Sequence, residues 1–180
     1  MEEIPPPKVY RLFYPVVPVL LTCRSKFTVG GLALTSVMFV SSNPPTLALS
    51  MHQSRATVGL LESSGVFALN WVGAELSSAI DEFGFTTGAG EPDKVARCGL
   101  RWREGRGHGV PVLVDAFASV ECSVQERTQV GDYFLYLASI DYSYSREDFH
   151  DYWSFDTYHP VFYLGADASG QHGRFQRSFP

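Results

Sequence analysis

The segment at residues 50–57 has the chemistry of an anion-binding site. Its sequence, SMHQSRAT, places hydroxyl groups, free backbone amides and the guanidinium of Arg55 at the start of a predicted helix. A helix N-terminus presents unpaired N–H groups and a partial positive charge to an anion, and an arginine adds a forked donor for phosphate. The segment is equally compatible with an ordinary helix start, in which Ser54 is the N-cap, Thr57 bonds back within the helix and Arg55 is solvated.

A second segment, residues 30–36, could accommodate a flat ring. Gly30 and Gly31 favour a tight turn, and the strand that follows presents small side chains at Ala33, Thr35 and Ser36. A planar ligand could approach such a backbone closely.

Other chemistry is not indicated by the motifs. The chain has no GxGxxG after a strand, no P-loop, no GxSxG and no HExxH. The five histidines are scattered, and the three cysteines form no CxxC pair, so we expect neither a metal site nor a disulfide framework. Free cysteines and an acidic N-terminus indicate the cytoplasm.

Charge and hydropathy argue against two classes of partner. The net charge is −5, and the 14 Lys and Arg residues are spread thinly, so no basic stripe is available for nucleic acid. The apolar run at residues 16–21 is too short to span a membrane.

The elements that must position these segments are mostly strands. Apolar and β-branched runs predict strands at residues 16–23, 32–40, 46–51, 66–70, 112–126, 133–144 and 161–164. Short helices are expected after Ser54 to about residue 62, at 73–83 and at 92–98. The prolines at positions 5–7 predict an extended arm over residues 1–8, and the tail after residue 165 is expected to be loosely ordered.

This pattern indicates one mainly β domain over residues 1–180. The strands do not alternate with helices as in a doubly wound sheet. We therefore expect an antiparallel β-barrel with a few short helices, because closure removes exposed sheet edges.

Seven motifs, in order over nearly the whole chain, carry a resemblance to a known family. They are YPVVPVLLT (14–22), GGLALTSVMFVSSNPPTLAL (30–49), SRATVGLLESSGVFALN (54–70), DEFGFTTG (81–88), DK (93–94), GDYFLYLASI (131–140) and YHPVFYLG (158–165). Together they resemble the flavin reductase-like, FMN-binding split-barrel family, which includes flavoredoxin and NAD(P)H:flavin oxidoreductases. The fold that this implies is a split, Greek-key antiparallel barrel.

The resemblance implies a set of cofactor-binding residues. Those beside the flavin ring and ribityl chain would be Leu34, Thr35, Ser36 and Val37. Those around the FMN phosphate would be Ser50, Met51, His52, Arg55, Ala56 and Thr57. Near the cofactor would also lie Phe83, Gly84, Thr87 and Lys94, although Thr87 replaces the common serine. His159 would lie near the flavin or the nicotinamide, or would only tether the chain before Pro160.

The implied function is hydride transfer from NADH or NADPH, bound transiently, to FMN. The electrons would pass to free flavin, an iron complex or a partner oxygenase. The alternative is a flavoredoxin-like electron carrier that does not use nicotinamide, and a third possibility is a flavin store or a member that has lost the cofactor. FMN is preferred to FAD because the anion site is one phosphate wide. A homodimer is expected, consistent with the 13 Phe, 9 Tyr and 3 Trp.

Overall fold

The protein is described by a computed structural model over residues 3–86, 93–147, 149, 151–166 and 173–177, so Thr87 lies outside the described residues. The helices are η1 (Pro6–Phe13), α1 (Ala56–Ser64), η2 (Ala74–Leu76), α2 (Ser77–Phe85) and α3 (Lys94–Arg97). The strands are β1 (Val19–Arg24), β2 (Val29–Leu34), β3 (Val37–Ser42), β4 (Pro45–His52), β5 (Val66–Trp71), β6 (Trp102–Glu104), β7 (Pro111–Leu113), β8 (Ala118–Val130), β9 (Tyr133–Ser145), β10 (Val161–Ala166) and β11 (Gly173–Arg177).

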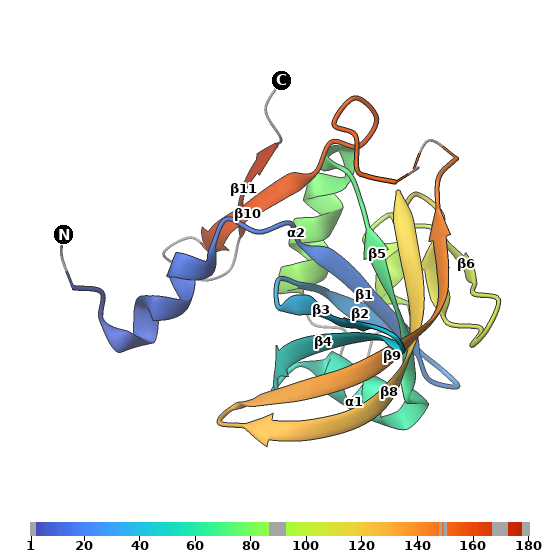
Figure 1. The fold of residues 1–180 in the computed structure, drawn as a ribbon, viewed down its shortest axis with the longest axis horizontal. Helices are drawn as coiled ribbons and strands as arrows, with labels where there is room; N and C mark the ends of the chain where they lie inside the picture. The colour runs from blue at the N-terminus through green and yellow to red at the C-terminus, as the bar shows by residue number, and fades with distance from the viewer. Residues whose placement is uncertain (1–2, 87–92, 148, 150, 167–172, 178–180) are drawn as a thin grey trace.

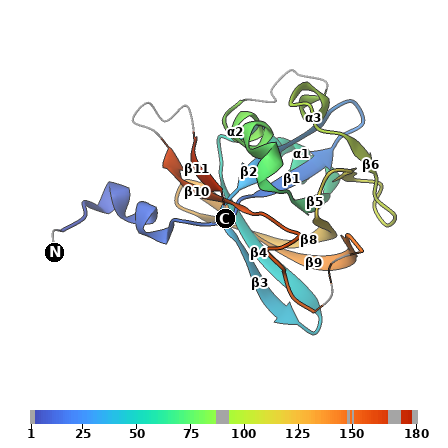
Figure 2. The same cartoon turned by 90° about the horizontal axis from the view of Figure 1, so that it is seen from above.

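Seven strands form one antiparallel sheet that curls until its edges meet. The strand order is β2-β1-β5-β8-β9-β4-β3, which places β2 and β3 at opposite edges. Only Thr35 and Ser36 separate these two strands in the chain, and so short a link spans at most about 10 Å. The edges must therefore lie close together, and Figures 1 and 2 show the resulting curved sheet. The prediction of a mainly β, split antiparallel barrel with a few short helices is confirmed.

Strand β1 is buried on both of its faces. Successive strand residues point to opposite faces, and Leu20 and Leu21 accordingly belong to two different buried clusters. Leu21 lies in the barrel core with residues such as Leu49, whereas Leu20 packs with Phe83 of α2. Helix α2 is thereby fixed against β1 and β2.

Two of the predicted strands are wrong, because each is two separate strands in the structure. The two halves of each segment pair with different neighbouring strands. The segment at 32–40 divides at Thr35 and Ser36, since β2 pairs with β1 and β3 pairs with β4. The segment at 112–126 divides similarly into β7, which pairs with the short β6, and β8, which pairs with β5 and β9.

Predictions for both ends of the chain are also wrong. The arm is not extended beyond residue 5 but forms η1, because a proline in the first helical turn lacks only an N–H that would have no helical partner. Figure 1 shows this helix projecting from the barrel. The tail contains β11, which pairs with β10. No helix in the described ranges combines the length and apolar character that crossing a membrane requires.

Candidate functional site

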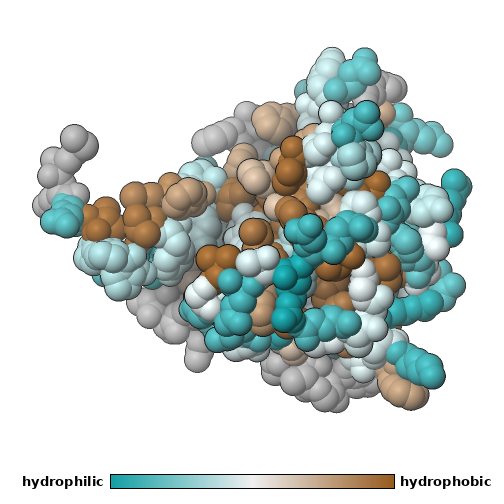
Figure 3. Space-filling model, turned by 60° about the horizontal axis from the view of Figure 1, so that its bottom comes forward, coloured by the Kyte–Doolittle hydropathy of each residue, from teal (hydrophilic) through white to brown (hydrophobic). Residues whose placement is uncertain are grey.

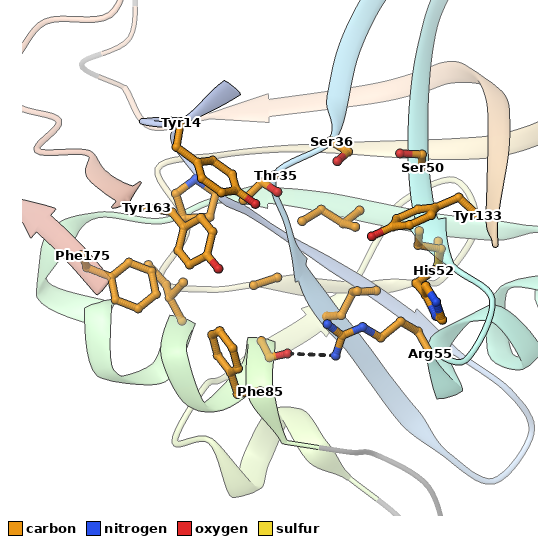
Figure 4. Close-up of a pocket in the computed structure, with 17 residues that line it drawn as sticks. Tyr14, Thr35, Ser36, Ser50, His52, Arg55, Phe85, Tyr133, Tyr163 and Phe175 are labelled. Atoms are coloured by element: carbon orange, nitrogen blue, oxygen red, sulfur yellow. Dashed lines mark hydrogen bonds between the residues drawn. The ribbon is translucent and has the colours of Figure 1, made fainter. Parts of the chain in front are cut away.

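Two adjoining hollows lie where β2, β4 and the ends of α1 and α2 meet. The wide hollow is lined by residues 32–36, residues 50–52 and a group of aromatic side chains (Figure 4). The cationic hollow is lined by residues 31–32, 54–57, 84–86 and Lys94. Leu32, Arg55, Gly84 and Phe85 belong to both, so the two hollows can hold two parts of one ligand.

The wide hollow contains most of the residues expected beside a ring. Leu34, Thr35 and Ser36 lie along one side, at the link between β2 and β3, and Ser50, Met51 and His52 of β4 also line it. The side chain of Met51 is almost completely buried in the barrel core. The side chain of Met51 therefore packs in the barrel core behind the wall of the wide hollow.

The cationic hollow contains three of the six residues expected around a phosphate, Arg55, Ala56 and Thr57, whereas Ser50, Met51 and His52 line the wide hollow. Ala56 and Thr57 open α1, where backbone N–H groups have no partner in the preceding turn. Arg55 precedes the helix, and its Nη1 donates to the carbonyl of Gly84 at 3.4 Å. The hollow thus combines a helix N-terminus with a guanidinium, which suits an anion.

Lys94 is the buried cation of this hollow. Its side chain is only 2% exposed, and Nζ donates to the carbonyl oxygens of Phe83 at 2.6 Å and Gly31 at 3.1 Å. Burial lowers the pKa of Lys94 to about 8. In the described part of the chain Lys94 forms no ion pair, and its charge is met by two backbone carbonyl dipoles and by the ring of Phe83. A bound phosphate would supply the missing counter-charge.

Gly31 makes this arrangement sterically possible. It lies within β2, opposite Thr22 of β1, so the predicted tight turn at Gly30 and Gly31 is wrong. A Cβ atom on Gly31 would collide with the carbonyl oxygen of Leu21 and lie 3.0 Å from the ring of Phe83. The absence of a side chain therefore permits close packing of β1, β2 and α2 beneath the Lys94 ammonium.

Ser54 has a different role from the predicted helix cap. The residue before α1 is Arg55, and it makes no side-chain capping bond. Ser54 instead lies in the cationic hollow with Oγ 2.7 Å from Nδ1 of His52. Ser54 lies one residue before the N-cap position, which Arg55 occupies.

Aromatic side chains from distant parts of the chain complete the wide hollow. Tyr14, Tyr163 and Phe175 lie together on one side in Figure 4, and the rings of Tyr14 and Tyr163 meet edge to face at 4.9 Å. Burial raises the pKa of Tyr163 to about 12, so its phenol is a neutral donor. Sequence reasoning missed this group, since β10 and β11 lie far from β2 in the chain.

Three of the expected site residues do not line either hollow. The side chain of Val37 is not in the lining. Phe83 is buried and contributes its carbonyl, while its ring lies 4.6 Å from Nζ of Lys94. His159 lines a separate hollow with Arg146, and its carbonyl accepts from the amide of Ala74. Across the described ranges, no three His, Cys, Asp or Glu side chains gather as a metal site would require.

The chain is similar to known proteins in both sequence and fold. The model of the flavin reductase like domain matches residues 10–161. An uncharacterized protein of Aeropyrum pernix is 33% identical over 86% of this chain and 59% of its own length. The FMN reductase (NADH) RutF of Agrobacterium fabrum is 28% identical over 62% of this chain and 61% of its own length. This chain thus spans about three fifths of these two relatives.

A solved structure shares the fold. Flavoredoxin from Methanosarcina acetivorans superposes with a TM-score of 0.82 at 18% identity, covering 100% of this chain and 92% of the other. At that identity the likeness establishes the architecture alone. With a domain match over most of its residues, the chain belongs to the flavin reductase-like family.

Proposed function

We propose that the chain binds FMN across the two hollows and acts as an NAD(P)H-dependent flavin oxidoreductase. The observation that carries this proposal is a buried cation in one hollow beside a second hollow lined by the link between β2 and β3. Lys94 lies in the cationic hollow without a carboxylate partner among the described residues, and the adjoining hollow runs along the backbone at Thr35 and Ser36. FMN has one phosphate and one flat ring to match them.

The chain's own residues would bind and orient the cofactor. Lys94, Arg55 and the amides that open α1 would hold the phosphate, while the link at residues 35–36 would lie beside the ring. FMN, when bound, accepts a hydride from nicotinamide and passes electrons to an acceptor. The phenols of Tyr14 and Tyr163 line the wide hollow and keep their protons, which equips them to donate to a polar edge of the ring.

Nicotinamide should reduce the bound flavin directly. On anaerobic stopped-flow mixing of the FMN-loaded protein with NADH or NADPH, we expect the flavin absorbance band near the visible maximum to bleach with at least one of them. Dithionite serves as the control that the flavin is reducible. Bleaching by dithionite but by neither nicotinamide would contradict the reductase proposal and favour the electron carrier.

We also propose that the chain forms a homodimer, because it exposes two apolar surfaces. Phe13 of the arm is 79% exposed, and Met38 and Phe39 of the edge strand β3 are 63% and 62% exposed. Figure 3 shows hydrophobic side chains along the projecting arm. A long edge strand with apolar side chains is prone to pairing unless it is covered. A second copy would cover it.

Light scattering should give a mass of twice the 20.0 kDa chain. Phe39→Asp should convert the dimer to a monomer, because it places a charge in the covered strand. Phe27→Asp is the matched control, since Phe27 is 86% exposed in the turn between β1 and β2. A wild-type protein with the mass of one chain would rule out the β3 interface. So would the same measured mass for the two variants.

A further inference from the structure

A series of polar contacts, an ion-pair contact followed by hydrogen bonds, joins the two hollows to the turn between β8 and β9. Asp132 Oδ2 lies 3.2 Å from Nε2 of His52, and Nδ1 of the same ring lies 2.7 Å from Oγ of Ser54. The carbonyl of Asp132 also accepts from the amide of Gln53 at 2.9 Å. His52 lines the wide hollow and Ser54 lines the cationic hollow, so the series ends where a phosphate would bind.

The contacts of His52 define which ring nitrogen carries the proton when the imidazole is neutral. The backbone N–H of Ser54 donates to Nδ1 of His52 at 3.1 Å, which requires a lone pair on Nδ1. The proton of the neutral ring is therefore on Nε2, facing the carboxylate of Asp132. The hydroxyl of Ser54 then donates to Nδ1 and turns the lone pairs of its oxygen towards the hollow.

That arrangement opposes a phosphate, since two oxygen lone pairs would face each other. One added proton on Nδ1 reverses it. The charged ring donates to Oγ of Ser54, and the hydroxyl hydrogen becomes free to point at a phosphate oxygen. Asp132 accepts the other ring N–H and balances the charge. The proton comes from solvent and no other covalent bond is made or broken, while the backbone N–H of Ser54 loses Nδ1 as its acceptor.

We propose that Asp132 and His52 are positioning residues that couple phosphate binding at Ser54 to the uptake of one proton by His52. The proposal rests on FMN binding across the two hollows. The charged and titratable groups that face His52 are Asp132, the Tyr133 ring at 5.3 Å, and Arg55 at the start of α1 (Figure 4). Lys94 lies beyond them in the cationic hollow.

The network is too exposed to matter chiefly for stability. The side chains of His52 and Asp132 are 36% and 67% exposed, and ion pairs in such positions contribute little to folding. The network is distinguished by its position, since His52 lines the wide hollow and Ser54 lines the cationic hollow. A second imidazole–carboxylate pair, His108 with Asp141 at 2.8 Å, has similar chemistry but lines neither hollow, and it offers a matched control.

Calorimetric titration with FMN at pH 7.0 measures the proton directly. Titrations in two buffers of different ionisation enthalpy give the number of protons taken up per FMN. We expect a substantial fraction of one proton, roughly 0.5–0.8, for the wild type. Lys94, whose pKa is about 8, and the FMN phosphate are both largely in their charged forms at this pH and change the count by only about 0.1 each.

His52→Asn should reduce the uptake to about 0.1 and weaken FMN binding roughly 2- to 12-fold, the effect of one hydrogen bond. Asp132→Asn should also lower the uptake, and His108→Asn should leave it unchanged. Riboflavin, which lacks the phosphate, should bind without proton uptake. FMN binding with the same proton count in wild type and His52→Asn would overturn the coupling alone. Failure of the wild type to bind FMN at any pH would overturn the proposed function as well.

Discussion

Replacing Lys94 by methionine should weaken FMN binding roughly 10- to 100-fold, because a hydrogen bond to a charged group contributes about 1.5–3 kcal/mol. Methionine has a similar length and keeps the buried stem packed against Phe83. It removes the only ammonium that lines the hollow among the described residues. Riboflavin affinity should change less than about twofold, since riboflavin has the same ring and no phosphate. Fluorescence quenching of each flavin gives both dissociation constants.

Lys26→Met is the matched control for this substitution. Lys26 is exposed in the turn between β1 and β2 and lines neither hollow. Lys26→Met should leave the affinities for FMN and riboflavin unchanged. This result would show that the effect of Lys94→Met comes from the lost contact between Lys94 and the phosphate, and not from the loss of one positive charge on the molecule. An equal loss of FMN and riboflavin affinity in Lys94→Met, with an unchanged melting temperature, would mean that Lys94 acts on the ring rather than the phosphate.

The phosphate end of the site could be predicted because its chemistry is local. The helix start, Arg55 and the small polar residues all lie within residues 50–57, and the structure divides them between two adjoining hollows, with residues 50–52 in the wide hollow and 54–57 in the cationic hollow. The strand predicted at residues 46–51 was recognisable in the same way, and it lies within β4. Alternating apolar residues and a proline pair are properties of the segment itself.

The rest of the site depends on contacts across the sheet, which periodicity does not encode. Asp132 meets His52 only because β4 pairs with β9, so that His52 lies opposite Tyr133. Tyr163 reaches the wide hollow because the chain at Val16 bridges to β10. The two glycines in β2 were interpreted as a turn, since sequence shows their flexibility but not the strand that approaches them.

Gly31→Ala should destabilise the protein by about 1–3 kcal/mol, the usual cost of overpacking a core, and by more if the backbone cannot shift. The added methyl group would meet the carbonyl of Leu21 in the paired strand, which is held by β1 pairing with both β2 and β5. For a chain of 180 residues this corresponds to a fall in melting temperature of roughly 3–10 °C, measured by circular dichroism.

The same substitution at Gly59 should have the opposite sign. Gly59 lies in α1, where a Cβ atom would have no neighbour within 4 Å, and alanine in a helix interior is more stable than glycine by about 0.5–1 kcal/mol. Since the chemical change is identical, the difference between the two variants reports the local environment, close packing at Gly31 and helix propensity at Gly59. Equal melting temperatures would show that β1 and β2 can separate by the width of a methyl group, and the close packing beneath Lys94 would then not be what holds its ammonium in the hollow.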